Sequence, residues 1–206
     1  MLQEIITGKD NQLYTFTGYC NKEQKILAYI CKRKERQYPI HFGIGCFHVS
    51  ENNEEVINIG RRFVENIKYS GIFGIELKKE SRDGKYKFGE LNMRFLMGNE
   101  LNVKSGIDLP YIYYKDMSGQ KVDPVAFFKD NVKLTNVFLD ISSFWQYHRL
   151  KEIKLWEWIK SYKGKVSDTY FAMDDLRPFG YILYKYILTI PRKFRKIFSH
   201  RNNGSE

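Results

Sequence analysis

The sequence contains no run of 18 or more consecutive apolar residues, so no segment predicts a membrane-spanning helix. Its first residues, MLQEIITGKD, lack the charged start and apolar run of a secretion signal. Three cysteines, Cys20, Cys31 and Cys46, are an odd number without C-x-x-C spacing, which argues against a disulfide framework and a zinc site. These absences predict a cytoplasmic protein with reduced thiols.

Apolar and aromatic residues, in contrast, are plentiful. Hydrophobic residues make up 43% of the 206 residues and aromatic residues 16%. This is enough to build a sizeable core and excludes wholesale disorder. The length suits one domain, or one and a half small ones.

Positive charge gathers near the C-terminus. The net charge is +10, but a large part of it lies between Arg177 and Arg201, where there is no acidic residue. The remainder is only mildly basic, so nucleic acid is an unlikely partner. An apolar stretch followed by PRKFRKIFSHR is suited to an anionic membrane surface, although a docked helix with a disordered basic end explains the same pattern. The basic residues are Arg177, Lys185, Arg192, Lys193, Arg195, Lys196 and Arg201.

The hydrophobic pattern predicts an α+β protein with a mostly antiparallel sheet and flanking helices. Asn53 suits the N-cap of one helix, and Pro191 is expected to end the last one. The predicted strands are 12–20, 25–36, 72–79 and 85–94, and the predicted helices are 54–69, 99–105, 149–162 and 179–190.

The strongest hairpin signal joins the strands at 72–79 and 85–94. A three-residue loop, Arg82–Gly84, places Glu76 directly opposite Glu90, with Cβ atoms roughly 5 Å apart. The same register pairs Lys78 with Phe88. A two-residue loop would shift the register by one residue and separate the glutamates.

Opposed carboxylates repel each other unless a cation lies between them. Mg²⁺ prefers oxygen ligands, and Asn92, on the same face as Glu90, offers an amide oxygen. Arg94 follows on that face and is suited to a phosphate or a developing negative charge. A solvated sheet face with ordinary charges remains the alternative.

A second candidate is the basic run that ends the strand at 25–36. On a regular strand Lys34 and Arg36 share one face, where they would suit a phosphate. A solvated edge strand is the ordinary explanation of such a run.

The stretch GIFGIELKKESRDGKYKFGELNMRF resembles the end of the ATP-grasp fold, in its carbamoyl-phosphate-synthase-like branch. The family pattern, a glutamate strand followed by E-x-N-x-R, falls on Glu76, Glu90, Asn92 and Arg94. SGIDLPYIYYKDMSG, RKERQYP and the hinge-like LQEIITG add support, so the resemblance covers about residues 2–119. Met93 departs from the proline that many members carry.

The resemblance implies an ATP-dependent carboxylate–amine ligase. A small carboxylate attacks the γ-phosphate of ATP, and an amine then displaces phosphate from the acyl phosphate. Asp10, after the hinge, is either a ribose contact or a plain turn residue. The implied roles are Mg²⁺ ligands at Glu76, Glu90 and Asn92, a catalytic group at Arg94, and nucleotide contacts at Gln3, Glu4, Ile6, Lys34 and Arg36.

Family members carry an N-terminal domain and a lid before the hinge, and this sequence shows neither G-x-G-x-x-G nor a P-loop. We therefore expect residues 1–119 to form the C-terminal ATP-grasp subdomain and residues 120–206 a helical appendage with a basic tail. Alone, the chain is expected to be inactive, completed by the missing part or a partner chain. The alternative is a non-catalytic remnant or binding module that uses the tail on a membrane or nucleic acid.

Overall fold

The computed structural model describes residues 4–125 and 127–199. The chain divides into two compact units, Met1–Ser167 and Asp168–Glu206. The first unit holds the sheet and the candidate site, and the second holds the long helix α6 (Arg177–Ser199). Gln3, Ala126 and Arg201 lie outside the described residues.

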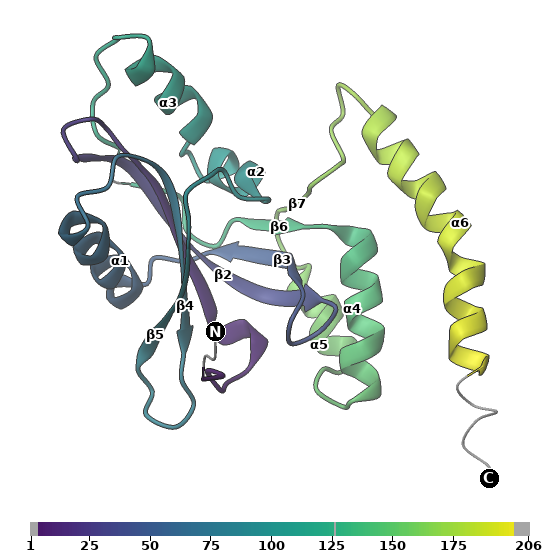
Figure 1. Ribbon diagram of the computed structural model, residues 1–206. Helices are drawn as coiled ribbons and strands as arrows, with labels where there is room; N and C mark the ends of the chain where they lie inside the picture. The colour runs from purple at the N-terminus through teal and green to yellow at the C-terminus, as the bar shows by residue number, and fades with distance from the viewer. Residues whose placement is uncertain (1–3, 126, 200–206) are drawn as a thin grey trace. The chain divides into compact units, whose positions relative to one another are not determined.

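One seven-stranded sheet organises the first unit, in the order β5-β4-β1-β2-β3-β6-β7 (Figure 1). The pairs β1–β2, β1–β4, β2–β3, β3–β6 and β4–β5 are antiparallel, so the predicted α+β class with a mostly antiparallel sheet is confirmed. The strands are β1 (Leu13–Cys20), β2 (Ile26–Tyr38), β3 (Ile44–Ser50), β4 (Gly71–Lys79), β5 (Tyr86–Asn92), β6 (Lys133–Thr135) and β7 (Val166–Asp168).

Helix α1 (Glu54–Asn66) covers the apolar face of the sheet, and its predicted N-cap is confirmed: the Asn53 side chain accepts a hydrogen bond from the Val56 N–H. At Gly60 the helix approaches Phe16 of β1 so closely that an added Cβ would lie 2.3 Å from the ring. A glycine at this helical position therefore lets α1 pack directly on the sheet.

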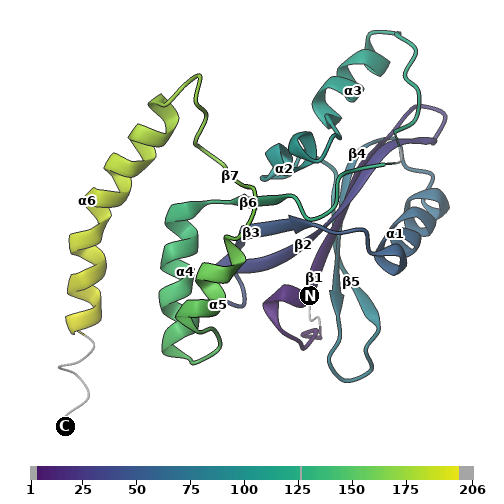
Figure 2. The ribbon, with the colours of Figure 1, turned by 180° about the vertical axis from the view of Figure 1, so that it is seen from behind.

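Helices α2 (Asn99–Lys104) and α3 (Leu109–Met117) pack on the sheet too. Asn102 of α2 contacts Lys32, whose β1 partner Thr15 points to the face opposite Phe16. Figures 1 and 2 accordingly show α1 and α2 on opposite sides of the sheet. The predicted helix at 99–105 is confirmed as α2, whereas α3 was not predicted.

The helix predicted at 149–162 is confirmed only over residues 155–161 and begins later than expected. The structure has α4 (Val137–Arg149) and α5 (Leu155–Ser161), separated by a turn in which Lys151 has φ +62°. A left-handed residue cannot continue a right-handed helix, which is why the segment divides there. Strand β6 and helices α4 and α5 belong to the first unit, which therefore continues beyond residue 119. The predicted division between residues 1–119 and 120–206 stays a prediction.

In the second unit, α6 runs through Pro191, so the expectation that this proline ends the helix is wrong. Proline removes one main-chain hydrogen bond and can kink a helix without ending it. Within the described residues, no helix is both long and apolar enough to cross a bilayer. The contact of the basic tail with an anionic membrane stays a prediction.

Candidate functional site

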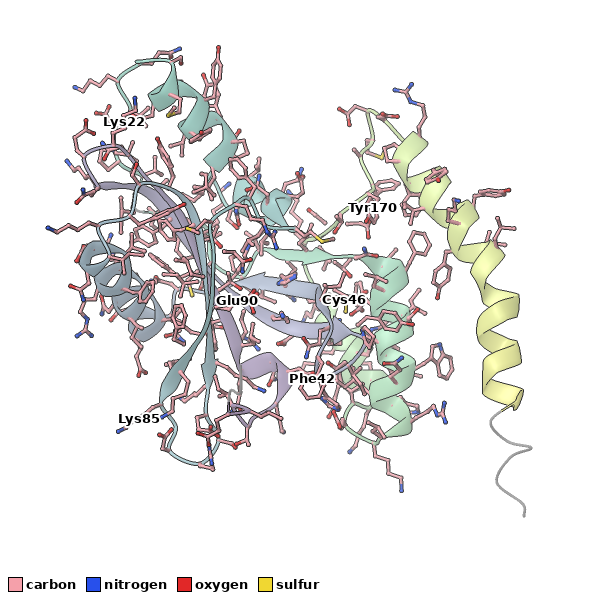
Figure 3. The ribbon with its side chains drawn as sticks, viewed as in Figure 1. Lys22, Phe42, Cys46, Lys85, Glu90 and Tyr170 are labelled. Atoms are coloured by element: carbon pink, nitrogen blue, oxygen red, sulfur yellow. The ribbon has the colours of Figure 1, made fainter. Side chains whose placement is uncertain are left out.

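A row of polar side chains crosses four strands on the face opposite α1. Thr15 of β1 pairs with Lys32 of β2 and with Glu76 of β4, and Glu76 pairs with Glu90 of β5. Directly paired residues point to the same face of a sheet. The predicted opposition of Glu76 and Glu90 is therefore confirmed, and Figure 3 shows where Glu90 lies on the sheet.

This register arises differently from the predicted one. The Glu80 N–H donates a main-chain hydrogen bond of 2.9 Å to the Lys85 carbonyl, which closes a loop at 81–84 that is one residue longer than expected. Between Glu76 and Leu77 the pairing then shifts, because Gly89 is an extra residue in β5. The longer loop and the bulge offset each other at Glu76.

The bulge corrects the pairing nearer the turn. Lys78 pairs with Lys87, and Phe88 pairs with Leu77 instead of Lys78. Phe88 therefore faces the α1 side, where it stacks on Phe63 with ring centroids 4.7 Å apart. The bulge therefore brings the Phe88 side chain, which is still 41% exposed, into contact with α1. The predicted register would have placed this side chain on the opposite face, in the polar row.

The carboxylates of this row are electrostatically suited to a cation. Burial raises the pKa of Glu76, and the neighbouring Glu90 carboxylate raises it further, while Lys34 and Lys32 act in the opposite direction. Asn92 donates a hydrogen bond of 2.6 Å to Glu90, so its amide lies at the same place. Glu76, Glu90 and Asn92 are therefore the residues that could hold a hard divalent cation, which would keep several other ligands.

No described residues form a cluster of three or more His, Cys, Asp or Glu side chains suited to a metal ion. The predicted set has two carboxylates and one amide. Mg²⁺ in nucleotide sites commonly takes one or two carboxylates and completes its shell with phosphates and water.

Lys32 is a member of this row that the sequence analysis did not name. Its side chain is only 3% exposed, and its ammonium donates to the Asn102 Oδ1 at 3.3 Å. Burial lowers the pKa of Lys32 to about 8, against the attraction of Glu76. The alternation of side chains along β2 could have identified it, because Lys32 and Lys34 lie on the same face of the strand. Through Thr15 of β1, that face continues to Glu76.

The lowered pKa of Lys32 predicts a specific pH dependence of stability. Between about pH 8 and pH 10.5 the unfolded chain binds more protons at Lys32 than the folded chain, so stability rises with pH across that window. The free energy of unfolding of the wild type, minus that of the Lys32→Met variant, should increase there by on the order of 3 kcal/mol. Urea denaturation at several pH values measures it, and a difference that stays flat across this window contradicts a lowered pKa of Lys32 in the folded chain.

Lys34 and His48 pair across β2 and β3 beside this row. Burial, followed by repulsion from Lys32 and Lys34, lowers the pKa of His48 to about 3, so this imidazole stays neutral. Gly45 makes room for it, because a Cβ there would lie 2.2 Å from the ring. Lys34 is buried, and its ammonium lies 3.5 Å from the Gln37 Oε1.

Arg36 does not share a face with Lys34, contrary to the prediction. Glu35 is an extra residue in β2, and this bulge turns Arg36 toward α4. There it forms a doubly hydrogen-bonded ion pair with the fully buried Asp140, at 2.7 and 3.0 Å. Trp158 and Tyr162 also donate to Asp140, at 2.8 and 2.6 Å, so the Arg36 charge is neutralised inside the protein.

The other predicted residues that the structure describes lie near the β4–β5 turn or beyond the end of β5. Glu4 is exposed and accepts a hydrogen bond of 2.6 Å from Arg82. Ile6 is half-buried, and Gln3 falls outside the described residues. Arg94 is exposed two residues beyond the end of β5, with one hydrogen bond of 3.3 Å to a main-chain carbonyl.

A cleft of about 770 Å³ lies next to the hinge segment, bounded by residues 8–12, the end of β2 and the turn after α4. Asp10 is fixed inside it by hydrogen bonds from the Tyr147 hydroxyl and from the His41 N–H. Burial acts to raise the pKa of Asp10, but hydrogen bonds from Tyr147, His41 and Gln37 outweigh it and hold the pKa below the usual value. Since Gln37 also contacts Lys34, a polar chain links the cleft to the row on the sheet.

Comparisons with known proteins identify the fold. The phosphoribosylaminoimidazole carboxylase ATPase subunit from Aquifex aeolicus matches 64% of this chain and 39% of its own, with a TM-score of 0.51 and 14% identity. D-aspartate ligase of Enterococcus faecium (strain Aus0004) is 26% identical over 96 residues. This chain has an ATP-grasp fold.

The similarity covers only part of these ATP-grasp relatives. The D-aspartate ligase match spans 46% of this chain and 23% of the ligase. A biotin carboxylase complex from Campylobacter jejuni matches 61% of the chain and 29% of its own, at 13% identity and a TM-score of 0.48. No protein-family model matches the sequence.

Proposed function

We propose that this chain forms the nucleotide- and Mg²⁺-binding part of an ATP-dependent carboxylate–amine ligase. The observation that carries the proposal is the opposition of Glu76 and Glu90 in one polar row with Lys32. A row that presents carboxylates beside buried ammonium groups suits a metal-bound polyphosphate, which carries charges of both signs. The resemblance to ATP-grasp enzymes and the match to D-aspartate ligase support the same chemistry.

In this proposal Glu76, Glu90 and Asn92 hold Mg²⁺, which when bound neutralises charge on the ATP phosphates. Lys32 and Lys34 hold phosphate oxygens or the substrate carboxylate from the other end of the row. Arg94, with its exposed side chain, stabilises the acyl phosphate or its successor. The carboxylate oxygen attacks the γ-phosphorus as ADP leaves, and the amine then displaces phosphate from the acyl carbon.

The cleft beside the hinge is the proposed place for the nucleoside. Its volume of about 770 Å³ suits a small-molecule ligand. In this proposal Asp10, held by a hydrogen bond from Tyr147, accepts a hydrogen bond from a ribose hydroxyl. The hinge, at Glu4 and Ile6, would border the base.

Binding of ADP with and without Mg²⁺ tests this function. We expect saturable binding in millimolar ADP that weakens at least about tenfold when EDTA removes Mg²⁺, because the carboxylates then repel the phosphates. Asp10→Asn should weaken binding in both conditions, since it alters the nucleoside contact and not the metal site, whereas the exposed Asp123→Asn control should not. Isothermal titration calorimetry measures each constant, and absence of saturable Mg-ADP binding by the wild type would overturn the proposal.

A further inference from the structure

A second cleft, of about 500 Å³, lies on the opposite side of the sheet from the polar row. Tyr29 of β2 forms its floor, and that ring contacts Phe16 on the α1 face. Glu54, Ile57 and Arg61 of α1 line one wall. Their spacing of three and four residues places all of them on one side of the helix, so the α1 side chains present a continuous surface to the cleft.

Arg61 is held in this cleft as a cation without a counter-ion. Its guanidinium carbon lies 4.6 Å from the centroid of the Tyr29 ring. Among the described residues it forms no ion pair, and its buried Nε has no hydrogen-bond acceptor. This contact holds the guanidinium against the ring, and its terminal amino groups offer a fork of donors that suits a carboxylate.

Two carboxylates border the same space without reaching Arg61. Glu54 and Asp130 line the cleft, and no ion pair joins either of them to Arg61 within the part of the chain that the structure describes. Asp130 is held in place because one of its oxygens accepts the Asn52 N–H at 3.0 Å. The cleft therefore presents one positive group, Arg61, and two negative groups, Glu54 and Asp130. This arrangement is complementary to a ligand that carries a positive and a negative charge.

The rest of the lining is apolar. Ile57 is buried at the wall, and Phe127 is 83% exposed. An aromatic side chain so exposed at the border of a cleft gains free energy when a ligand covers it. The cleft therefore offers one cation, two anions and an apolar surface within a volume that suits a small molecule.

We propose that this cleft binds a free α-amino acid with an aromatic or branched aliphatic side chain. Arg61 receives the carboxylate, Glu54 and Asp130 receive the ammonium group, and the side chain packs on Phe127 and Ile57. The site is independent of the proposed ligase function, because it uses none of the residues of the polar row.

Three probes separate the parts of this recognition: L-phenylalanine, its methyl ester and N-acetyl-L-phenylalanine. The ester lacks the carboxylate charge and the acetylated form lacks the ammonium charge. Followed by NMR shifts of the cleft amides, L-phenylalanine should bind at millimolar concentration, and each analogue should bind about tenfold more weakly, as expected for loss of a charge-assisted contact. Equal binding of all three probes, or of none, overturns the proposal.

Neighbouring residues on α1 supply matched control variants. Arg61→Gln should weaken L-phenylalanine binding about tenfold, whereas Arg62→Gln, at an exposed residue outside the cleft, should leave it within twofold. Glu54→Gln, in the cleft, and Glu55→Gln, outside it, form a second pair of test and control. Both residues are exposed, so neither substitution should prevent folding. If both members of each pair behave alike, binding occurs elsewhere and the assignment of this cleft is wrong.

Discussion

Glu90→Gln is expected to weaken Mg-nucleotide binding at least tenfold. The substitution preserves size and removes one of the two charges that face the proposed cation. Outer-shell partners of metal sites alone are worth about 10–100-fold in metal affinity, so a direct ligand should cost no less. Glu90 is exposed, and the loss should therefore appear in binding and not in the free energy of unfolding. Calorimetric titration with Mg-ADP measures it.

The control for this substitution is Glu100→Gln, which removes an exposed acid from α2. That variant should bind Mg-ADP as the wild type does. In EDTA, Glu90→Gln should bind ADP at least as well as the wild type, because one source of repulsion toward the phosphates is gone. Equal loss with and without Mg²⁺ would mean that Glu90 contacts the nucleotide without a metal, contrary to the account.

Asp140→Ala should lower the free energy of unfolding by about 3–5 kcal/mol. Asp140 is fully buried and pairs with the almost equally buried Arg36. Burial acts to lower the pKa of Arg36. The hydrogen bonds and the charge of Asp140 outweigh that effect, so the pKa of Arg36 is raised above its usual value. Alanine leaves the guanidinium without its counter-ion and deprives Trp158 and Tyr162 of their acceptor. Urea denaturation followed by tryptophan fluorescence measures the loss.

The double variant Arg36→Met with Asp140→Leu tests the cause of that loss. Replacing a whole buried ion pair by apolar residues commonly costs little, whereas removing one partner costs much. The double variant should therefore be more stable than Asp140→Ala alone. A loss below about 1 kcal/mol for Asp140→Ala, or a double variant less stable than the single one, would contradict a tightly paired Arg36.

The candidate site was predictable where local pattern determines the structure. Alternation on β4 and β5 placed Glu76, Glu90 and Asn92 together, although the loop length was wrong and Gly89 restored the register by a bulge. At Arg36 the same alternation failed, since Glu35 adds a residue to β2. A bulge depends on what the neighbouring strands and helices require, and a single strand sequence does not record that.

Contacts between distant parts of the chain could not be predicted. Asp10 owes its position to Tyr147, which lies 137 residues further along the sequence. Helix α4 escaped prediction, and its buried Asp140 and Ser143 interrupt the apolar pattern that marks a helix facing a core. Those polar residues are explained only by partners such as Arg36 and Cys46, at the place where Figure 3 shows Cys46 beside α4.

The central claim is that Glu76, Glu90 and Asn92 share one cation with a bound nucleotide. Substituting Mn²⁺ for Mg²⁺ tests it most directly, because the paramagnetic ion broadens the NMR signals of nearby amides. With Mn²⁺ and ADP together, the account predicts the strongest broadening at these residues and at Lys32, and much weaker broadening at Arg61 on the other side of the sheet. Broadening that is centred elsewhere, or that is the same without ADP, would contradict the claim.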